Sequence, residues 1–158
     1  MMTHTFVVLA YKESRYLENC IQSVLNQKFK SDVVIATSTR NDFIKRIANK
    51  YHLDIIDNPN PGKGIGYDFD FARTCVHSDL VTIAHQDDVY DPTYSKEVVS
   101  HFEKYKDATI LFTDYYELRN GKRVYENTNL KIKRIMLMPL HNKKLSNQKI
   151  IKRLPLSL

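Results

Sequence analysis

The chain has few cysteines and no long hydrophobic run. Its two cysteines, Cys20 and Cys75, each fall on the apolar side of a predicted helix. This placement favours buried, reduced thiols in a cytosolic protein over a disulfide or a metal pair. No apolar run approaches the roughly 18 residues needed to span a bilayer. The first residues, 1–5, lead directly into a strand-like segment, so we expect neither a signal peptide nor a membrane span.

Acidic residues are absent from the last part of the chain. Residues 127–158 contain eight lysines or arginines and no Asp or Glu, whereas the preceding residues contain 16 basic and 18 acidic ones. A basic segment interleaved with Ile, Leu and Met can lie on an anionic membrane surface or bind nucleic acid. It can equally be a solvated edge of the protein. We therefore expect a domain at 1–126 and a basic C-terminal segment at 127–158.

The rest of the composition suits a folded domain, and its pattern predicts an α/β fold. Apolar residues make up 42% of the chain, which is enough to bury a core. Apolar, β-rich runs alternate with segments of helical period as far as Asp114, which is typical of a parallel sheet with crossover helices. The predicted strands are 5–10, 33–37, 53–57, 80–84 and 109–113. The predicted helices carry apolar stripes over 17–25, 43–51, 65–77 and 94–105.

Local signals predict how some of these elements begin and end. Ser14 can cap the first helix, and Asp91-Pro92 has the N-cap and N1 chemistry of the fourth. The segment Arg119-Asn120-Gly121-Lys122 is typical of a hairpin turn between strands at 115–118 and 124–126.

Polar groups that follow the strands are the candidates for chemistry, because ligands of open α/β sheets bind at the carboxyl ends of the strands. The most suggestive group is His85-Gln86-Asp87-Asp88, after the fourth strand. Two adjacent carboxylates repel each other unless a cation or a helix terminus offsets them, and their oxygens suit a hard divalent ion. Alternatively, Asp87 and Asp88 cap or solvate a turn. The glycines at 62, 64 and 66 match no phosphate-binding spacing and indicate little by themselves.

Several segments, in the right order, resemble family 2 glycosyltransferases of the GT-A fold. The run 7–13 (VVLAYKE) and the run 16–27 (YLENCIQSVLNQ) resemble the opening strand and helix of that family, which end in a Tyr-containing turn and in Leu-x-Gln. Asn60, Gly62 and Gly66 resemble its Asn-x-Gly segment, and 83–88 (IAHQDD) resembles its Asp-x-Asp metal motif. The later segment 112–115 (FTDY) resembles a bacterial branch with a His-Gln-Asp-Asp form of the motif.

The resemblance implies a Rossmann-like, mostly parallel sheet flanked by helices, and an inverting transfer of sugar from a nucleotide-diphospho-sugar to a glycan or lipid-linked acceptor. It implies Mg²⁺ or Mn²⁺ on Asp87 and Asp88, because a cation offsets the charge that develops on the leaving diphosphate. The implied donor-binding residues are Ala10, Tyr11, Glu13, Thr37, Gly66, Asp70, Gln86 and Asp87. It also implies a cytoplasmic protein that makes a surface polysaccharide or similar glycan, with peripheral contact at the inner face of the membrane through the basic segment.

The sequence departs from this family at three positions. The acidic residue usual after the second strand is replaced by 36–39 (ATST), the first Asp of Asp-x-Asp by His85, and an Ala-Arg-Asn triplet by 68–70 (DFD). Each departure falls on a segment that the family uses to bind the donor or the metal.

Family members also carry a catalytic base downstream, but no acidic residue follows Glu126. We therefore expect a chain truncated before the acceptor-binding half, with the catalytic residue unknown. The alternative is that the base is among Asp107, Asp114, Glu117 and Glu126.

Three alternatives to a glycosyltransferase make different predictions. A non-catalytic remnant that binds nucleotide-sugar would differ from the enzyme in showing neither transfer nor donor hydrolysis. The basic segment lacks an aromatic stacking platform, so we expect no nucleic acid partner. A nucleotidyltransferase would carry a first loop rich in Gly, Arg or Lys, and 11–14 (YKES) is not such a loop.

Overall fold

The computed structural model describes residues 2–111 and 113–138 and divides the chain into two compact units, Met1–Lys106 and Asp107–Leu158. The first unit contains a parallel four-stranded sheet in the order β3-β2-β1-β4. Its strands are β1 (His4–Ala10), β2 (Asp32–Thr37), β3 (Ile55–Asp57) and β4 (Leu80–His85). Its helices are α1 (Leu17–Leu25), α2 (Asp42–Tyr51), α3 (Ile65–Thr74) and α4 (Tyr94–Lys104). The predicted α/β class is confirmed.

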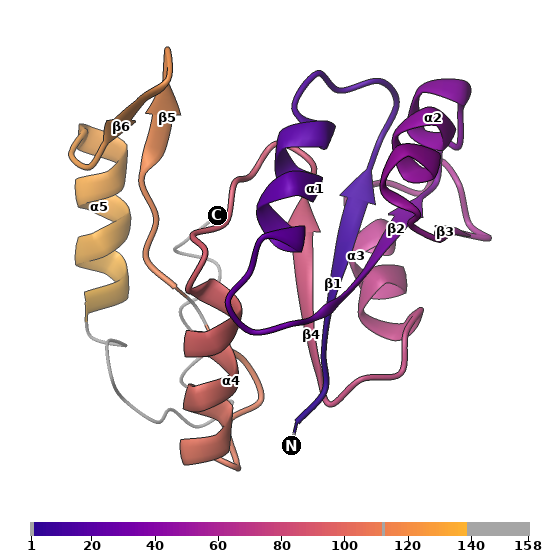
Figure 1. Ribbon diagram of the computed structural model, residues 1–158. Coiled ribbons are helices and arrows are strands. Elements are labelled where there is room, and N and C mark those ends of the chain that lie inside the picture. Colours follow the sequence, from indigo (N-terminus) through magenta and orange to yellow (C-terminus); the bar gives the residue numbers. More distant parts are fainter. Residues whose placement is uncertain (1, 112, 139–158) are drawn as a thin grey trace. The chain divides into compact units, whose positions relative to one another are not determined.

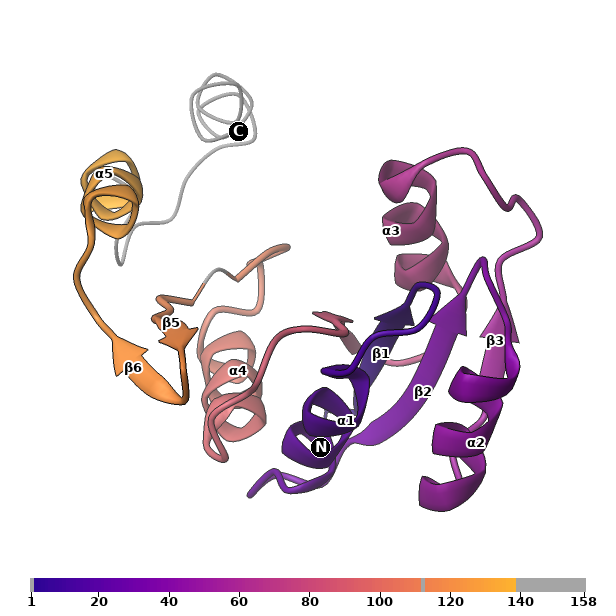
Figure 2. The ribbon, with the colours of Figure 1, turned by 90° about the horizontal axis from the view of Figure 1, so that it is seen from above.

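Both faces of the sheet are covered, which explains why β1 is apolar throughout. Phe6, Val8 and Ala10 pack with α1 and α2 on one face, whereas Val7 packs with Ala72 of α3 on the other. Figure 1 and Figure 2 show α1 and α2 on one side of the sheet and α3 on the opposite side. Since successive strand residues point to opposite faces, a strand covered on both sides needs apolar residues at every position.

The two predicted helix caps are wrong, because the observed N-cap residues, Tyr16 and Thr93, each lie two residues later. The helix α1 begins at Leu17 with no side-chain cap, and Ser14 instead accepts the Leu17 N–H on its carbonyl at 3.1 Å. The helix α4 begins at Tyr94. The Asp91 carboxylate accepts the N–H of Thr93 at 2.9 Å and closes a turn ahead of the helix. Asp, Ser and Thr stabilise such turns by the same hydrogen bonds that they make as caps, so composition cannot separate the two roles.

Several strands and helices begin or end one to three residues from the predicted bounds. The third strand begins at Ile55 rather than residue 53, the third helix ends at Thr74 rather than 77, and the fourth strand extends to His85. Both cysteines are free thiols; Cys20 is buried as predicted, whereas Cys75 is only half-buried.

The second unit contains a hairpin at the predicted turn, followed by α5 (Thr128–Leu137). Its strands are β5 (Glu117–Arg119) and β6 (Lys122–Val124), rather than the predicted 115–118 and 124–126, because Arg119 and Lys122 pair with each other. Asn120 and Gly121 both have positive φ, 51° and 74°, as a tight turn between twisted strands requires. The predicted strand at 109–113 is wrong for residues 109–111 and 113, which form no strand. Residue 112 lies outside the described residues. An apolar run becomes a strand only where a neighbouring strand supplies its hydrogen bonds.

No helix among the described residues is long and apolar enough to cross a bilayer. Of the predicted basic segment, residues 139–158 lie outside the described part of the chain.

Candidate functional site

The carboxyl ends of β1 and β4 are joined by a reciprocal pair of hydrogen bonds. The Gln86 side chain accepts the Tyr11 N–H through Oε1 and donates to the Tyr11 carbonyl through Nε2, both at 3.0 Å. We call this pair the Gln86–Tyr11 bridge. It connects the residue that precedes Asp87 to a tyrosine whose side chain is half exposed. Two of the residues expected to bind donor are therefore in contact.

The end of β2 contacts the same edge through hydroxyl groups. The Lys12 N–H donates to Thr39 Oγ1 at 2.6 Å, and the Thr39 N–H donates to Thr37 Oγ1 at 3.0 Å. Lys12 adopts a left-handed backbone conformation with φ 53°, which directs the chain away from β1 after one residue. Ala10 and Thr37 are buried, so their side chains face the core. Ala10 can therefore take part at the edge only through its backbone atoms, whereas Thr37 also contributes the hydroxyl that accepts the Thr39 N–H.

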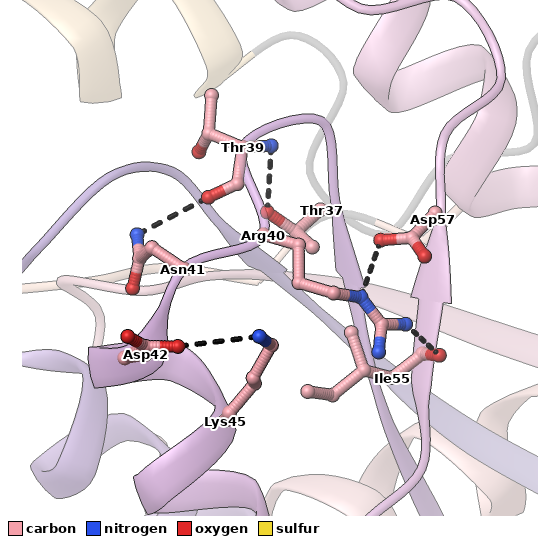
Figure 3. A network of polar contacts seen from close by, with 8 residues as sticks. All are labelled: Thr37, Thr39, Arg40, Asn41, Asp42, Lys45, Ile55 and Asp57. Atoms are coloured by element: carbon pink, nitrogen blue, oxygen red, sulfur yellow. Dashed lines mark hydrogen bonds and ion pairs between the residues drawn. The ribbon is translucent and has the colours of Figure 1, made fainter.

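An arginine joins the ends of β2 and β3, as Figure 3 shows. The Arg40 Nε donates to Asp57 Oδ1 at 2.7 Å, and another guanidinium nitrogen donates to the Ile55 carbonyl at 2.7 Å. Asn41 caps α2 by accepting the Ile44 N–H at 2.9 Å. These contacts fix the loop that replaces the acidic residue usual after the second strand of the family resembled.

A second acidic residue that contacts this loop comes from α3. The Asp68 carboxylate accepts from Asn58 Nδ2 at 2.8 Å and from Ser38 Oγ at 3.4 Å. Asn58 is itself buried and donates its N–H to the Thr37 carbonyl at 2.8 Å. Asp70, the carboxylate expected at the donor site, pairs with Arg73 along the helix surface at 2.8 Å. Sequence reasoning therefore missed Asp68 and Asn58, which are far apart in the chain from the strand end that they contact.

Other expected donor residues lie on the same loops without contacts that fix them. Glu13 is exposed in the turn after β1. Gly66 is exposed in the first turn of α3, with no atom close to the place where a Cβ would stand. Both remain predictions.

Asp87 and Asp88 are exposed residues in a tight turn, in which the Asp88 N–H donates to the His85 carbonyl at 3.1 Å. Partial desolvation of its carboxyl group raises the pKa of Asp88, His85 opposes that rise, and the neighbouring Asp87 carboxylate adds to it. The His85 ring packs against Phe69 of α3, with centroids 5.0 Å apart. The pair is therefore electrostatically unfavourable as it stands and favours a nearby cation.

The donor set fits a hard divalent ion bound partly by a ligand. Two carboxylates supply oxygen atoms at one turn, and Mg²⁺ commonly takes one or two carboxylates and completes its shell with water and phosphate oxygens. Within residues 2–111 and 113–138, no group of three or more His, Cys, Asp or Glu side chains converges on one point. A site held by protein groups alone, such as structural zinc, is thus not formed in that part of the chain.

A buried glutamine joins the end of α1 to the segment that follows the acidic turn at Asp87 and Asp88. Gln27 Nε2 donates to the carbonyls of Ser23, at 3.0 Å, and Asp91, at 2.9 Å, and its Oε1 accepts the N–H of fully buried Ser95 at 2.9 Å. The Cys20 thiol donates to the His85 carbonyl at 3.1 Å. Burial raises the pKa of this thiol to about 12, and Asp88 and Asp87 contribute. The thiol is thus a neutral donor that supports the strand end.

Comparison with known proteins identifies the family. The profile described as Glycosyl transferase family 2 matches residues 5–153, nearly the whole chain. The chain belongs to glycosyl transferase family 2. A curated relative in the same class, an uncharacterized glycosyltransferase of Haemophilus influenzae, is 26% identical over 113 residues, which are 62% of this chain and 32% of the relative. The chain therefore spans about a third of the length of the curated relative that it matches.

Solved structures show that the family 2 chain has the GT-A fold. S. aureus TarS 1-349 superposes with a TM-score of 0.59 at 16% identity, over 73% of this chain and 40% of TarS 1-349. The same TarS segment in complex with UDP-GlcNAc gives a TM-score of 0.59 at 16% identity, over 73% of this chain and 38% of that one. The mannosyltransferase PcManGT from Pyrobaculum calidifontis, in complex with GDP-Man and Mn²⁺, gives 0.55 at 14% identity, over 76% of this chain and 37% of PcManGT.

Proposed function

We propose that this chain binds a nucleotide-diphospho-sugar and a divalent cation at the carboxyl edge of its parallel sheet. The donor would serve an inverting transfer of sugar to a glycan or lipid-linked acceptor. The observation that carries the proposal is the Gln86–Tyr11 bridge, which ties the acidic turn to an exposed aromatic ring. Two structures with this fold, TarS and PcManGT, were solved with UDP-GlcNAc and with GDP-Man and Mn²⁺.

The residues at this edge would bind two parts of the donor, the nucleobase and the diphosphate. The exposed ring of Tyr11 offers a flat face on which a nucleobase can stack. Asp87 and Asp88 would hold the cation by their carboxylate oxygens, next to the diphosphate. When bound, the cation offsets the charge of the leaving nucleoside diphosphate. Gln86 immediately precedes Asp87, and its side chain makes two hydrogen bonds to the Tyr11 backbone. It thereby keeps the distance between the Tyr11 ring and the two carboxylates constant.

A second function, donor binding without efficient transfer, is favoured by the state of the carboxylates considered as a base. Asp114 is paired with Arg134 at 3.1 Å, Glu117 with Arg119 at 2.7 Å, and Glu126 with Lys131 at 3.3 Å. A general base must be positioned against the acceptor hydroxyl, and its assistance is typically worth about 10² to 10⁴ in rate. These three carboxylates are oriented by neighbouring cations instead, so we expect this chain to bind donor and to transfer sugar slowly.

Thermal unfolding with UDP-, GDP- and dTDP-sugars, each with and without Mn²⁺, tests the binding proposal. A donor at about 100 times its Kd stabilises the folded protein by about 2.7 kcal/mol. For a chain of this size that is roughly 5 to 10 °C in Tm. We expect such a shift only with Mn²⁺ and the matching nucleotide, and its loss in Asp87→Asn. Glu103→Gln, at an exposed position near the end of α4, is the control for loss of one negative charge.

The outcomes separate binding from transfer. A shift of equal size in Asp87→Asn and wild type would remove the cation site from the proposal. Incubation of the wild-type chain with the best donor, Mn²⁺ and membrane or glycan extract then follows released nucleotide and labelled sugar. Slow nucleotide release without labelled product supports binding alone, whereas efficient labelling would establish transfer and identify Asp114 or Glu117 as bases to be mutated.

A further inference from the structure

The helix α5 carries an apolar stripe on its exposed side. Ile132, Ile135 and Met138 recur every three residues and are 50, 65 and 68% exposed, whereas Leu130 in the same helix is fully buried. Residues three apart in a helix lie on the same side. One apolar side of the helix is therefore buried in the folded protein, and a second apolar side is exposed to solvent. Three large apolar side chains exposed in one row are uncommon in soluble proteins.

The segment that contains this stripe has a net positive charge. Lys131, whose side chain is 61% exposed, lies next to Ile132 and pairs with Glu126 at 3.3 Å, and Arg134 pairs with Asp114 at 3.1 Å. Residues 127–158 have eight basic and no acidic residues, so the other basic residues have no acidic partner within the segment. Lysine can extend its charged end away from apolar neighbours, so it is compatible with a stripe that is buried in lipid. An apolar row with basic residues and no acidic ones is the composition of helices that lie in the interface of anionic membranes.

We propose that α5 docks on an anionic lipid surface, with Ile132, Ile135 and Met138 inserted among the acyl chains near the headgroups. This proposal is independent of donor and cation binding. Charge complementarity decides between occupants, because a second copy would bring the same basic segment and repel the first. Nucleic acid would satisfy the charges and leave the apolar stripe without a partner, and residues 127–158 contain no aromatic side chain for base stacking.

The test is co-sedimentation of the full chain with sucrose-loaded vesicles, in the absence of nucleotide and metal. Vesicles of phosphatidylcholine alone are compared with equimolar phosphatidylcholine and phosphatidylglycerol, at low and high salt. We expect binding to the anionic vesicles only, weakened by salt. The double variant Ile132→Ser with Ile135→Ser, which changes no charge, should lower the partition coefficient at least about tenfold, since both side chains lose their apolar contact with lipid.

The matched control is Ile65→Ser with Ile110→Ser, two isoleucines that are 66 and 58% exposed outside α5. It should bind within about twofold of wild type, and circular dichroism melts should show both double variants folded. Equal binding to neutral and anionic vesicles, or equal loss in the two double variants, would overturn the proposal. So would wild-type binding that persists unchanged in the α5 variant. A dimer in sedimentation equilibrium that the α5 variant abolishes would show that the stripe binds a second copy of the chain. Binding to duplex DNA without binding to vesicles would show that the basic residues bind nucleic acid. Either result would reject the lipid surface.

Discussion

Replacing Gln27 by methionine should destabilise the first unit and loosen the segment that follows the acidic turn. Methionine keeps the length and volume of the side chain but makes none of its three hydrogen bonds. The Ser95 N–H, fully buried, would lose its acceptor, which costs about 1 to 3 kcal/mol, and the two carbonyls would each lose about 0.5 to 1.5 kcal/mol. Allowing for the apolar side chain that is gained, we expect a loss of about 2 to 5 kcal/mol in the free energy of unfolding.

Urea unfolding followed by far-UV circular dichroism measures this loss, provided that the slope with urea is unchanged between variants. The matched control is Gln22→Met, because Gln22 lies in α1, which Gln27 follows, is exposed, and donates only to the Tyr51 hydroxyl among the described contacts. We expect less than about 0.5 kcal/mol there. If the two variants unfold at the same urea concentration, the hydrogen bonds of Gln27 contribute nothing net, and the argument that this residue holds the segment that follows the acidic turn fails.

Three further predictions concern stability and thiol reactivity. Burial lowers the pKa of His4 from 6.5 to about 4. As the pH falls, the imidazole is therefore protonated in the unfolded chain at a higher pH than in the folded one. The free energy of unfolding should fall by on the order of 1 to 3 kcal/mol as the pH drops from 6.5 towards 4. The urea midpoint of His4→Gln should depend less on pH than that of the wild type. Ellman's reagent at pH 8 should leave Cys20 unlabelled until denaturant is added and should label half-buried Cys75 first, and the reverse order would contradict the structure. Gly121→Ala should cost about 1 kcal/mol or less in the second unit, seen as loss of hairpin NMR shifts, because φ is 74° there; unchanged shifts would count against the turn.

Sequence patterns located the fold because its buried strands and helical stripes are local signals. The runs at 5–10, 33–37 and 80–84 are apolar at successive positions, and this property follows from burial on both faces of one sheet. The run at 109–113 has the same apolar character, yet its described residues form no strand. The three runs that form strands each pair with a neighbouring strand, and such pairing depends on the folded chain and not on the residues of the run itself.

The candidate site was predictable only in part, for a similar reason. Strand ends identify Tyr11 and Asp87 because every strand of a parallel sheet brings its carboxyl end to the same edge. The partners that fix this edge are separated by long stretches of chain: Ser38 contacts Asp68, 30 residues away, and Gln27 contacts Ser95, 68 residues away. No spacing rule links such pairs. The resemblance did mark Gln27 within Leu-x-Gln, and the structure supplies the physical reason for a glutamine there.

In the Gln86–Tyr11 bridge, the backbone of Tyr11 connects the two strands, whereas its side chain takes no part in that connection. Both hydrogen bonds end on main-chain atoms, so any residue except proline at position 11 can complete them. The ring of Tyr11 is consequently open to substitution without loss of the connection between the two strands. If Tyr11 stacks on the nucleobase, as we propose, a library at this single position would vary the surface offered to the base while the acidic turn keeps its place. Engineering of a new donor preference should then begin at this position.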